Sequence, residues 1–179
     1  NGGIVYLIRG KVGGYAGPLD LASPPTGSVL SILGQTGYAF GASVNGVGDI
    51  NGDGRKDIGI GAPRSSVGGN SSGAACVIFG QPAGAGYGST LDSATLTPAQ
   101  GFFFLGAQAF DQVGTNINYA GDVNGDGGDD LILGGTTVTT QGRTNVGQGY
   151  VYYGVVPVPS PSPSSSVTPT PSSSMTGTP

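Results

Sequence analysis

The sequence contains no histidine, tryptophan or glutamate, and it has one cysteine among its 179 residues. Without histidine, the Ser-His-Asp and Cys-His catalytic arrangements are excluded. Charged residues make up 9% of the chain and its formal net charge is −4. This argues against nucleic acid as a partner, because phosphate binding needs clustered lysine and arginine. No apolar run approaches the ~20 residues of a membrane-spanning helix, so we expect no membrane span.

The single cysteine and the lack of a recognisable signal peptide say little about where the protein resides. Cys76 lies in the apolar segment AACVIFG, where we expect a small buried residue on a strand rather than an interchain disulfide. A single cysteine does not identify the redox compartment. No signal peptide is recognisable, which fits a mature form.

Glycine is the abundant residue, with 37 copies, and valine, isoleucine, tyrosine, serine and threonine are also common. The helix formers glutamate, lysine and arginine are absent or scarce. This composition predicts an all-β chain with many tight turns.

The chain also contains an internal repeat. DINGDGRKDIGIG at 49–61 recurs as DVNGDGGDDLILG at 122–134, an offset of 122 − 49 = 73. The similarity extends to either side, and GGIVYLIRG, ending at Gly10, is a third copy of the element that closes each repeat. The repeat predicts four parts: a terminal strand at 1–10, repeats at 11–80 and 81–154, and a tail at 155–179.

Each repeat contains four short strand candidates. In the first repeat they lie near 29–33, 39–45, 57–61 and 74–79. Apolar runs bounded by glycine are typical of strands. Four strands per repeat is the pattern of a propeller blade. A duplicated β-sandwich is the alternative.

The repeated segment has the pattern D-x-N-x-D-G-x-x-D, which is typical of a calcium loop. Calcium is a hard cation that takes several oxygen ligands from a tight loop, and glycine at the sixth position makes the sharp turn. Positions 1, 3, 5 and 9 would supply side-chain oxygens, and position 7 its backbone carbonyl. An EF-hand continues to a glutamate at position 12 and then a helix, whereas here a strand follows position 9. The predicted ligands are Asp49, Asn51, Asp53, Arg55 and Asp57 in the first loop, and Asp122, Asn124, Asp126, Gly128 and Asp130 in the second.

The alternative for each loop is a metal-free hairpin turn, which Asn, Asp and Gly also favour. Two copies at matching repeat positions favour two calcium ions. Binding both would bring the formal charge from −4 to zero (−4 + 2 × 2).

With these residues the chain resembles an FG-GAP repeat protein, the family that includes the integrin alpha-subunit propeller. Phe40-Gly41 and 61–63 (Gly-Ala-Pro) stand at the two motifs that name the family. The second copy has Val113-Gly114 and 134–136 (Gly-Gly-Thr) instead, while its Asp loop is intact. The resemblance covers about 1–154. It implies calcium-stabilised blades in an extracellular protein of adhesion, matrix or recognition type, with no catalysis.

In the family's strand order, the Phe-Gly strand is innermost in a blade. The N-terminus then supplies the last two strands of one blade, near 4–8 and 29–33, followed by one full blade and the first three strands of another. Unfinished sheets at both ends invite pairing with another chain. The partners we expect are therefore copies of the same chain, joined head to tail by strand complementation. A piece of a longer propeller chain is the alternative.

From Val155 the composition changes to proline, serine and threonine without charge. Such a stretch is typical of polyproline II or mucin-like segments, and a flexible linker is the alternative. Ser160, Ser162, Thr168 and Thr170 resemble the Ser-Pro and Thr-Pro units of hydroxyproline-rich glycoproteins, which implies O-linked glycans. Asn70-Ser71-Ser72 is an N-glycosylation sequon.

Two function classes follow from the sequence. The first is a structural, extracellular, calcium-binding glycoprotein that assembles head to tail into a filament or matrix. The second is an adhesion or recognition module, a fragment of a larger closed propeller that binds protein or glycan. An enzyme is not expected, because six of the ten aspartates lie at predicted calcium ligands and the remaining ones show no catalytic spacing.

Overall fold

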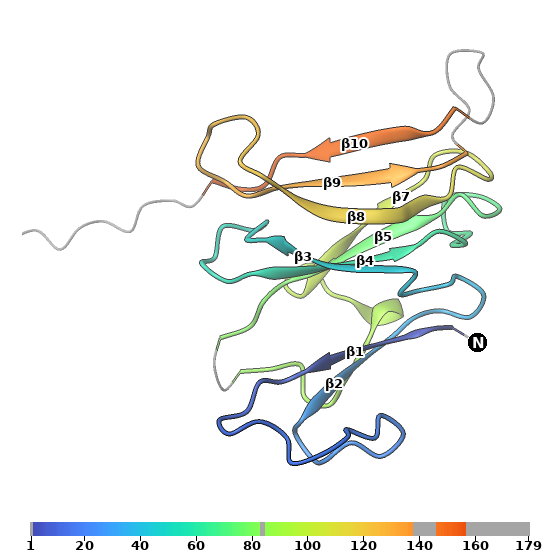
Figure 1. The fold of residues 1–179 in the computed structure, drawn as a ribbon. Coiled ribbons are helices and arrows are strands. Elements are labelled where there is room, and N and C mark those ends of the chain that lie inside the picture. The colour runs from blue at the N-terminus through green and yellow to red at the C-terminus, as the bar shows by residue number, and fades with distance from the viewer. Residues whose placement is uncertain (1, 83–84, 138–145, 157–179) are drawn as a thin grey trace, which may run out of the picture.

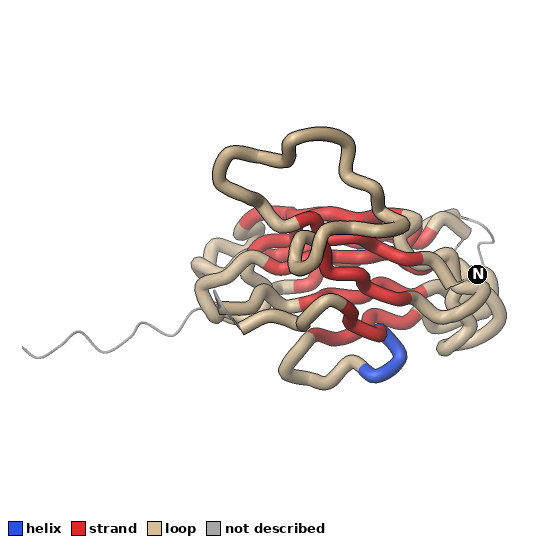
Figure 2. Tube along the Cα trace, turned by 90° about the horizontal axis from the view of Figure 1, so that it is seen from below, coloured by secondary structure: helices blue, strands red, loops and turns tan. Residues whose placement is uncertain are grey.

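Three small β-sheets lie one on another in the computed structural model, which describes residues 2–82, 85–137 and 146–156 (Figure 1). Seen from below, their strands overlie one another, and one short helical turn stands at the side (Figure 2). This turn is the 3-10 helix η1 at Ser93–Thr95, and the described ranges contain no α-helix. No helix in these ranges is long and apolar enough to cross a membrane. The strands are β1 (Ile4–Ile8), β2 (Val29–Leu33), β3 (Ser43–Gly48), β4 (Asp57–Ala62), β5 (Ala74–Ile78), β6 (Thr90–Asp92), β7 (Gly101–Leu105), β8 (Val113–Gly121), β9 (Asp130–Gly135) and β10 (Gln148–Tyr152).

The sheets follow the predicted blade order. The N-terminal sheet has the order β1-β2-β6, the central sheet β3-β4-β5-β7, and the third sheet β8-β9-β10. All pairings are antiparallel except that of β2 with β6. The central sheet is the complete blade, and its fourth strand, β7, comes from the second sequence repeat. The all-β, propeller-blade-like fold with incomplete blades at both ends is therefore confirmed, while the predicted polyproline II tail lies mainly at 157–179, outside the described residues.

Strand β3 begins later than the predicted 39–45. Ala39 and Gly41 have φ of +52° and +89°, which lie in the left-handed region and interrupt an extended strand. The backbone therefore turns before β3, whose register with β4 begins at Ser43.

The core consists of two apolar layers, one on each face of the central sheet. On β5, Ala74, Cys76 and Ile78 face the N-terminal sheet, whereas Ala75 and Val77 face the third sheet. Both faces of β5 are buried, which explains its continuous apolar run. Cys76 is a free, fully buried thiol, as predicted, and burial raises its pKa to about 12.

The Phe-Gly position is a packing site between sheets in both repeats. Phe40 is buried in the layer next to the N-terminal sheet. Val113, which replaces phenylalanine in the second repeat, is buried in the other layer. The smaller side chain therefore keeps the interfacial role of this position.

A glycine on the central sheet sets how closely the third sheet approaches. A Cβ on Gly59 would lie 2.6 Å from Val47 Cγ1 and 2.8 Å from Ile117 Cδ1. We expect Gly59→Ala to lower the free energy of unfolding by about 1–2 kcal/mol, because overpacking a dense interface forces neighbouring side chains to shift. Denaturant titration measures this. Gly46→Ala on neighbouring β3, where a Cβ meets nothing within 4 Å, should change stability far less; equal effects would contradict the steric explanation.

Candidate metal centre

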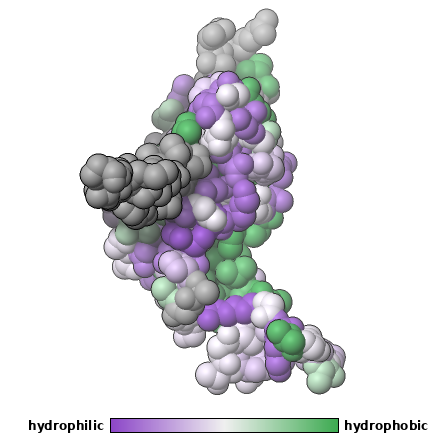
Figure 3. All heavy atoms as spheres, turned by 90° about the vertical axis from the view of Figure 1, so that its left-hand side faces the viewer, coloured by the Kyte–Doolittle hydropathy of each residue, from purple (hydrophilic) through white to green (hydrophobic). Residues whose placement is uncertain are grey.

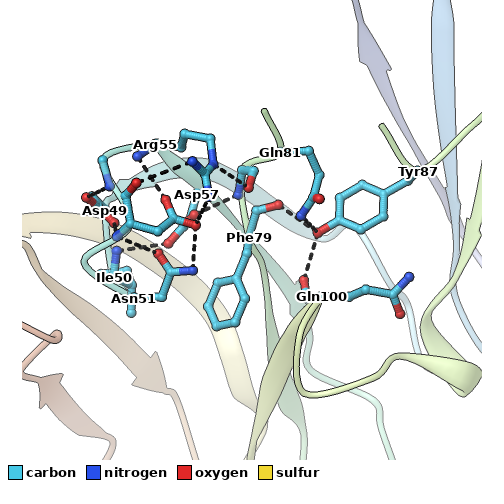
Figure 4. Close-up of polar contacts among 12 residues, drawn as sticks. Asp49, Ile50, Asn51, Arg55, Asp57, Phe79, Gln81, Tyr87 and Gln100 are labelled. Atoms are coloured by element: carbon cyan, nitrogen blue, oxygen red, sulfur yellow. Dashed lines mark hydrogen bonds and ion pairs between the residues drawn. The ribbon is translucent and has the colours of Figure 1, made fainter. Parts of the chain in front are cut away.

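The first Asp loop, Asp49–Asp57, joins β3 to β4 and is held by its own side chains (Figure 4). The carboxylate of Asp49 accepts hydrogen bonds from the backbone N–H groups of Asp53 (3.0 Å) and Gly54 (2.7 Å). Asn51 Oδ1 also accepts from Asp53 N, at 3.2 Å. Gly54 has φ of +85°, a conformation that glycine adopts without strain. The turn predicted at the sixth position is thus present.

The second Asp loop, Asp122–Asp130, joins β8 to β9 with the same bonding pattern. Asp122 accepts from the N–H groups of Asp126 (3.0 Å) and Gly127 (2.8 Å), and Gly127 has φ of +88°. Asn124 Oδ1 accepts from Asp126 N at 3.1 Å. Two sequences that differ at several positions therefore adopt one loop conformation, as the repeat predicts.

The ninth residue of each loop is a buried carboxylate. Asp57 is 1% exposed and accepts from Ile50 N and Gly80 N, both at 2.8 Å. Asp130 is fully buried and accepts from Val123 N (2.8 Å) and Gly154 N (3.1 Å). Each carboxylate thus joins its loop to the residue that follows the third strand of the blade.

The electrostatics of Asp57 favour a cation nearby. Burial raises the pKa of Asp57, the N–H groups of Gly80 and Ile50 oppose this, and the negative charges of Asp53 and Asp49 add to it. Three carboxylates within nine residues therefore disfavour ionisation of the buried one, and a bound cation would offset that cost.

The residues suit calcium by their chemistry, although their side chains do not converge here. In the described ranges, no group of three or more His, Cys, Asp or Glu side chains is placed to hold a metal ion. The carboxylates bond to the loop's own N–H groups, and Asp53 Oδ2 also accepts from Asn51 Nδ2 (2.9 Å) and Arg55 Nη2 (2.7 Å). A carboxylate offers about four lone-pair sites, so these bonds leave acceptor capacity. Four oxygen-bearing side chains per loop are the donors that calcium prefers.

The residues predicted at position 7 differ between the loops. The Arg55 guanidinium pairs with Asp53, and Arg55 Nε donates to Gly80 O at 3.2 Å. Gly128 has no side chain, so within the described part of the chain Asp126 Oδ2 accepts only from Asn124 Nδ2, at 2.7 Å. That their backbone carbonyls bind calcium stays a prediction.

The two loops are joined by Asp129, which the sequence reasoning missed. Asp129 Oδ2 accepts from Lys56 Nζ (2.6 Å) and from the backbone N–H of Asp49 (2.7 Å), while Oδ1 accepts from Tyr119 (2.9 Å). The hydrogen bond from Lys56 is the main cause that lowers the pKa of Asp129. We call this set of bonds the Asp129 bridge. A signal was present: position 8 carries opposite charges in the two loops, Lys56 and Asp129, 73 residues apart.

A backbone hydrogen bond also links the first loop to the segment that follows β10. Val155 N donates to Ile50 O at 2.9 Å. The chain leaving the third sheet is thereby attached to the first loop.

The predicted glycosylation sites are mostly outside the described residues. Asn70 is described: it is exposed in the connection between β4 and β5. Ser160, Ser162, Thr168 and Thr170 fall at 157–179 and are not described. Glycosylation of all five stays a prediction.

Comparison with known proteins matches the segment that contains the first Asp loop to a known repeat family. Residues 40–78, from Phe40 to the end of β5, match the family model of the FG-GAP repeat. The comparison supports an FG-GAP repeat protein. Integrin alpha-3 of Mus musculus is 39% identical over 67 residues, which cover 37% of this chain and 6% of the integrin. The chain thus spans a small part of this curated relative. The residues that match the repeat model, 40–78, include the whole first Asp loop.

Proposed function

We propose that this chain is an extracellular, calcium-binding module of propeller blades, of the adhesion or recognition type. The observation that carries the proposal is the recurrence of one loop conformation at equivalent places in two blades. The similarity to an FG-GAP repeat and to integrin alpha-3 supports the non-enzymatic, cell-surface or secreted assignment. In this proposal each ion neutralises the carboxylates of one loop and rigidifies the hairpin between the two inner strands.

Calcium titration by isothermal calorimetry tests the proposal. We expect two ions per chain, with dissociation constants of about 10⁻⁴–10⁻³ M, as for other extracellular calcium modules. Asp53→Asn and Asp126→Asn should each remove one ion, because each substitution takes a charge from one loop only. Asp92→Asn is the control, since Asp92 caps η1 away from both loops and should leave two ions. A wild-type chain that binds no calcium, and melts alike with and without chelator, would refute the calcium role.

A second candidate function is a structural glycoprotein subunit that assembles head to tail into a filament or matrix. The observation that favours it is the pair of unfinished sheets. Among the described residues, β1 pairs only with β2, and β10 only with β9, so each terminal blade offers an open strand edge. Unlike surfaces that meet head to tail form a ring if they close and a filament if they do not.

A further inference from the structure

Two equivalent residues of the repeats, Val44 and Ile117, differ in whether a neighbouring sheet covers them. Val44 on β3 is 44% exposed, whereas Ile117, its equivalent on β8 (44 + 73 = 117), is fully buried. Ile117 packs against the central sheet, whose inner strands β3 and β4 lie beneath it. Val44 pairs with Ile60 and so faces the N-terminal sheet. Among the described residues this sheet consists of β1, β2 and β6, without such inner strands. Val44 therefore lacks the cover that its equivalent has.

A cavity of about 570 Å³ lies beside this uncovered region, between the N-terminal and central sheets. Its lining includes Leu7 of β1, Gly46 of β3 and Ile58 of β4. Figure 3 shows hydrophobic residues, in green, gathered at the junction between these two sheets. The open side of β1 therefore borders a hollow with a mainly apolar lining, in which Arg9, Lys56 and Asp57 are the charged residues.

The interface on the other side of the central sheet is packed with aromatic rings. Phe102 packs against Phe79, Phe104 and Tyr152 in tilted or edge-to-face arrangements, at centroid distances of 5.9, 5.0 and 5.5 Å. In the repeat alignment the corresponding residues of the N-terminal interface are smaller or charged: Arg9, Leu30, Ile32 and Ile78. All four line the cavity.

The opposite end of the molecule exposes an apolar surface of matching kind. Ile132 on β9 and Val151 on β10 are 42% and 48% exposed, and they are paired across the two strands. On the central sheet, the face equivalent to theirs is covered by the third sheet. Strand β10, which carries Val151, is also the edge strand of this sheet.

We propose that a second copy of this chain docks its third sheet onto the N-terminal sheet. Its β10 edge pairs with the open edge of β1, and its Ile132 and Val151 cover Val44 and the mouth of the cavity. The second copy is the occupant because it carries both an open strand edge, β10, and an uncovered face of the required polarity. The proposal rests on the head-to-tail assembly described above and names the surfaces that make the contact.

The two contact surfaces differ, so they can be blocked separately. Val44→Lys places a charge on the acceptor surface, and Val151→Lys places one on the donor surface; burying an unpaired ammonium is strongly unfavourable. Val67→Lys is the matched control, because Val67 is also exposed (55%), in the connection between β4 and β5, and lies on neither surface. Light scattering after size-exclusion chromatography and negative-stain microscopy of the full chain, in calcium, give the assembly state.

We expect concentration-dependent assemblies for the wild type and for Val67→Lys. Val44→Lys and Val151→Lys alone should each weaken association at least tenfold. Mixed together they should form a dimer and nothing larger, because each variant retains one intact surface. A monomeric wild type, or a mixture that fails to pair, would overturn the docking.

Calcium binding is measured on the same samples so that the two proposals fail separately. A wild type that binds two ions and stays monomeric overturns the docking and leaves the calcium role intact. Assembly without calcium binding overturns the calcium role and leaves the docking intact.

Discussion

Replacing Asp57 with alanine is expected to lower the free energy of unfolding by about 2–6 kcal/mol. The carboxylate is buried and accepts from Ile50 N and Gly80 N, both at 2.8 Å. Alanine leaves two backbone donors without partners, and each buried unsatisfied donor costs about 1–3 kcal/mol. The substitution also removes a predicted calcium ligand, so its effect should be larger in calcium than in chelator.

Urea denaturation in excess chelator separates these two contributions. The loss caused by the unpaired N–H groups should persist there. Asp92→Ala is the control, because Asp92 also accepts from a backbone N–H, that of Ala94 (2.9 Å), but is exposed, and a cap of this kind contributes about 1 kcal/mol. If Asp57→Ala costs no more than Asp92→Ala in chelator, Asp57 does not hold the hairpin together.

The blade order was predictable because it depends on local patterns. Apolar runs between glycines gave the strands, and the 73-residue repeat predicted that each Asp loop joins two strands of one hairpin. The sequence also predicted that the sheets do not coincide with the repeats. The segments of β1, β5 and β10 are copies of one element, each followed by a glycine, so β1 had to be the third strand of an incomplete blade. These features arise from backbone conformation and burial, which a single chain encodes in residue type and spacing.

The features that were not predicted depend on contacts between distant segments. Strand β6 is three residues long and pairs in parallel with β2, which no periodicity in so short a segment indicates. The cavity exists because Arg9 and Leu30 stand where Phe79 and Phe102 stand in the next interface, and comparing these positions requires knowing which sheets face each other. The Asp129 bridge likewise depends on where the second loop lies relative to the first.

The Asp129 bridge should make calcium binding at the two loops positively cooperative. Two divalent cations repel each other, so electrostatics alone predicts that one ion weakens binding of the other. The bridge acts in the opposite direction: an ion that orders the second loop also fixes Asp129, whose carboxylate holds the backbone of Asp49 at 2.7 Å. The ion that binds second then has less of its own loop to order, so it loses less conformational entropy and binds more tightly.

Asp129→Ala should abolish this coupling, and calorimetry can measure it. The affinity of the first loop is compared in chains with an intact second loop and in chains carrying Asp126→Asn. We expect the intact second loop to raise first-loop affinity about tenfold, a coupling of ~1.4 kcal/mol, and Asp129→Ala to remove the difference. Asp129→Ala should also destabilise the chain by about 1.5–3 kcal/mol through the lost hydrogen bond between a charged group and Asp49 N.

A second substitution tests the bridge from the other side without touching a carboxylate. A Cβ on Gly48 would lie 2.6 Å from Asp129 Oδ2, so Gly48→Ala should displace Asp129 and reproduce the loss of coupling. Gly121→Ala is the matched control: it has the equivalent place before the second loop and a similar φ, +80° against +88°, but its Cβ would meet nothing within 4 Å. Both substitutions strain the backbone alike, so only the steric contact differs. If the two variants lose the same amount of coupling, or if the wild type binds its two ions with negative cooperativity, the bridge does not couple the loops.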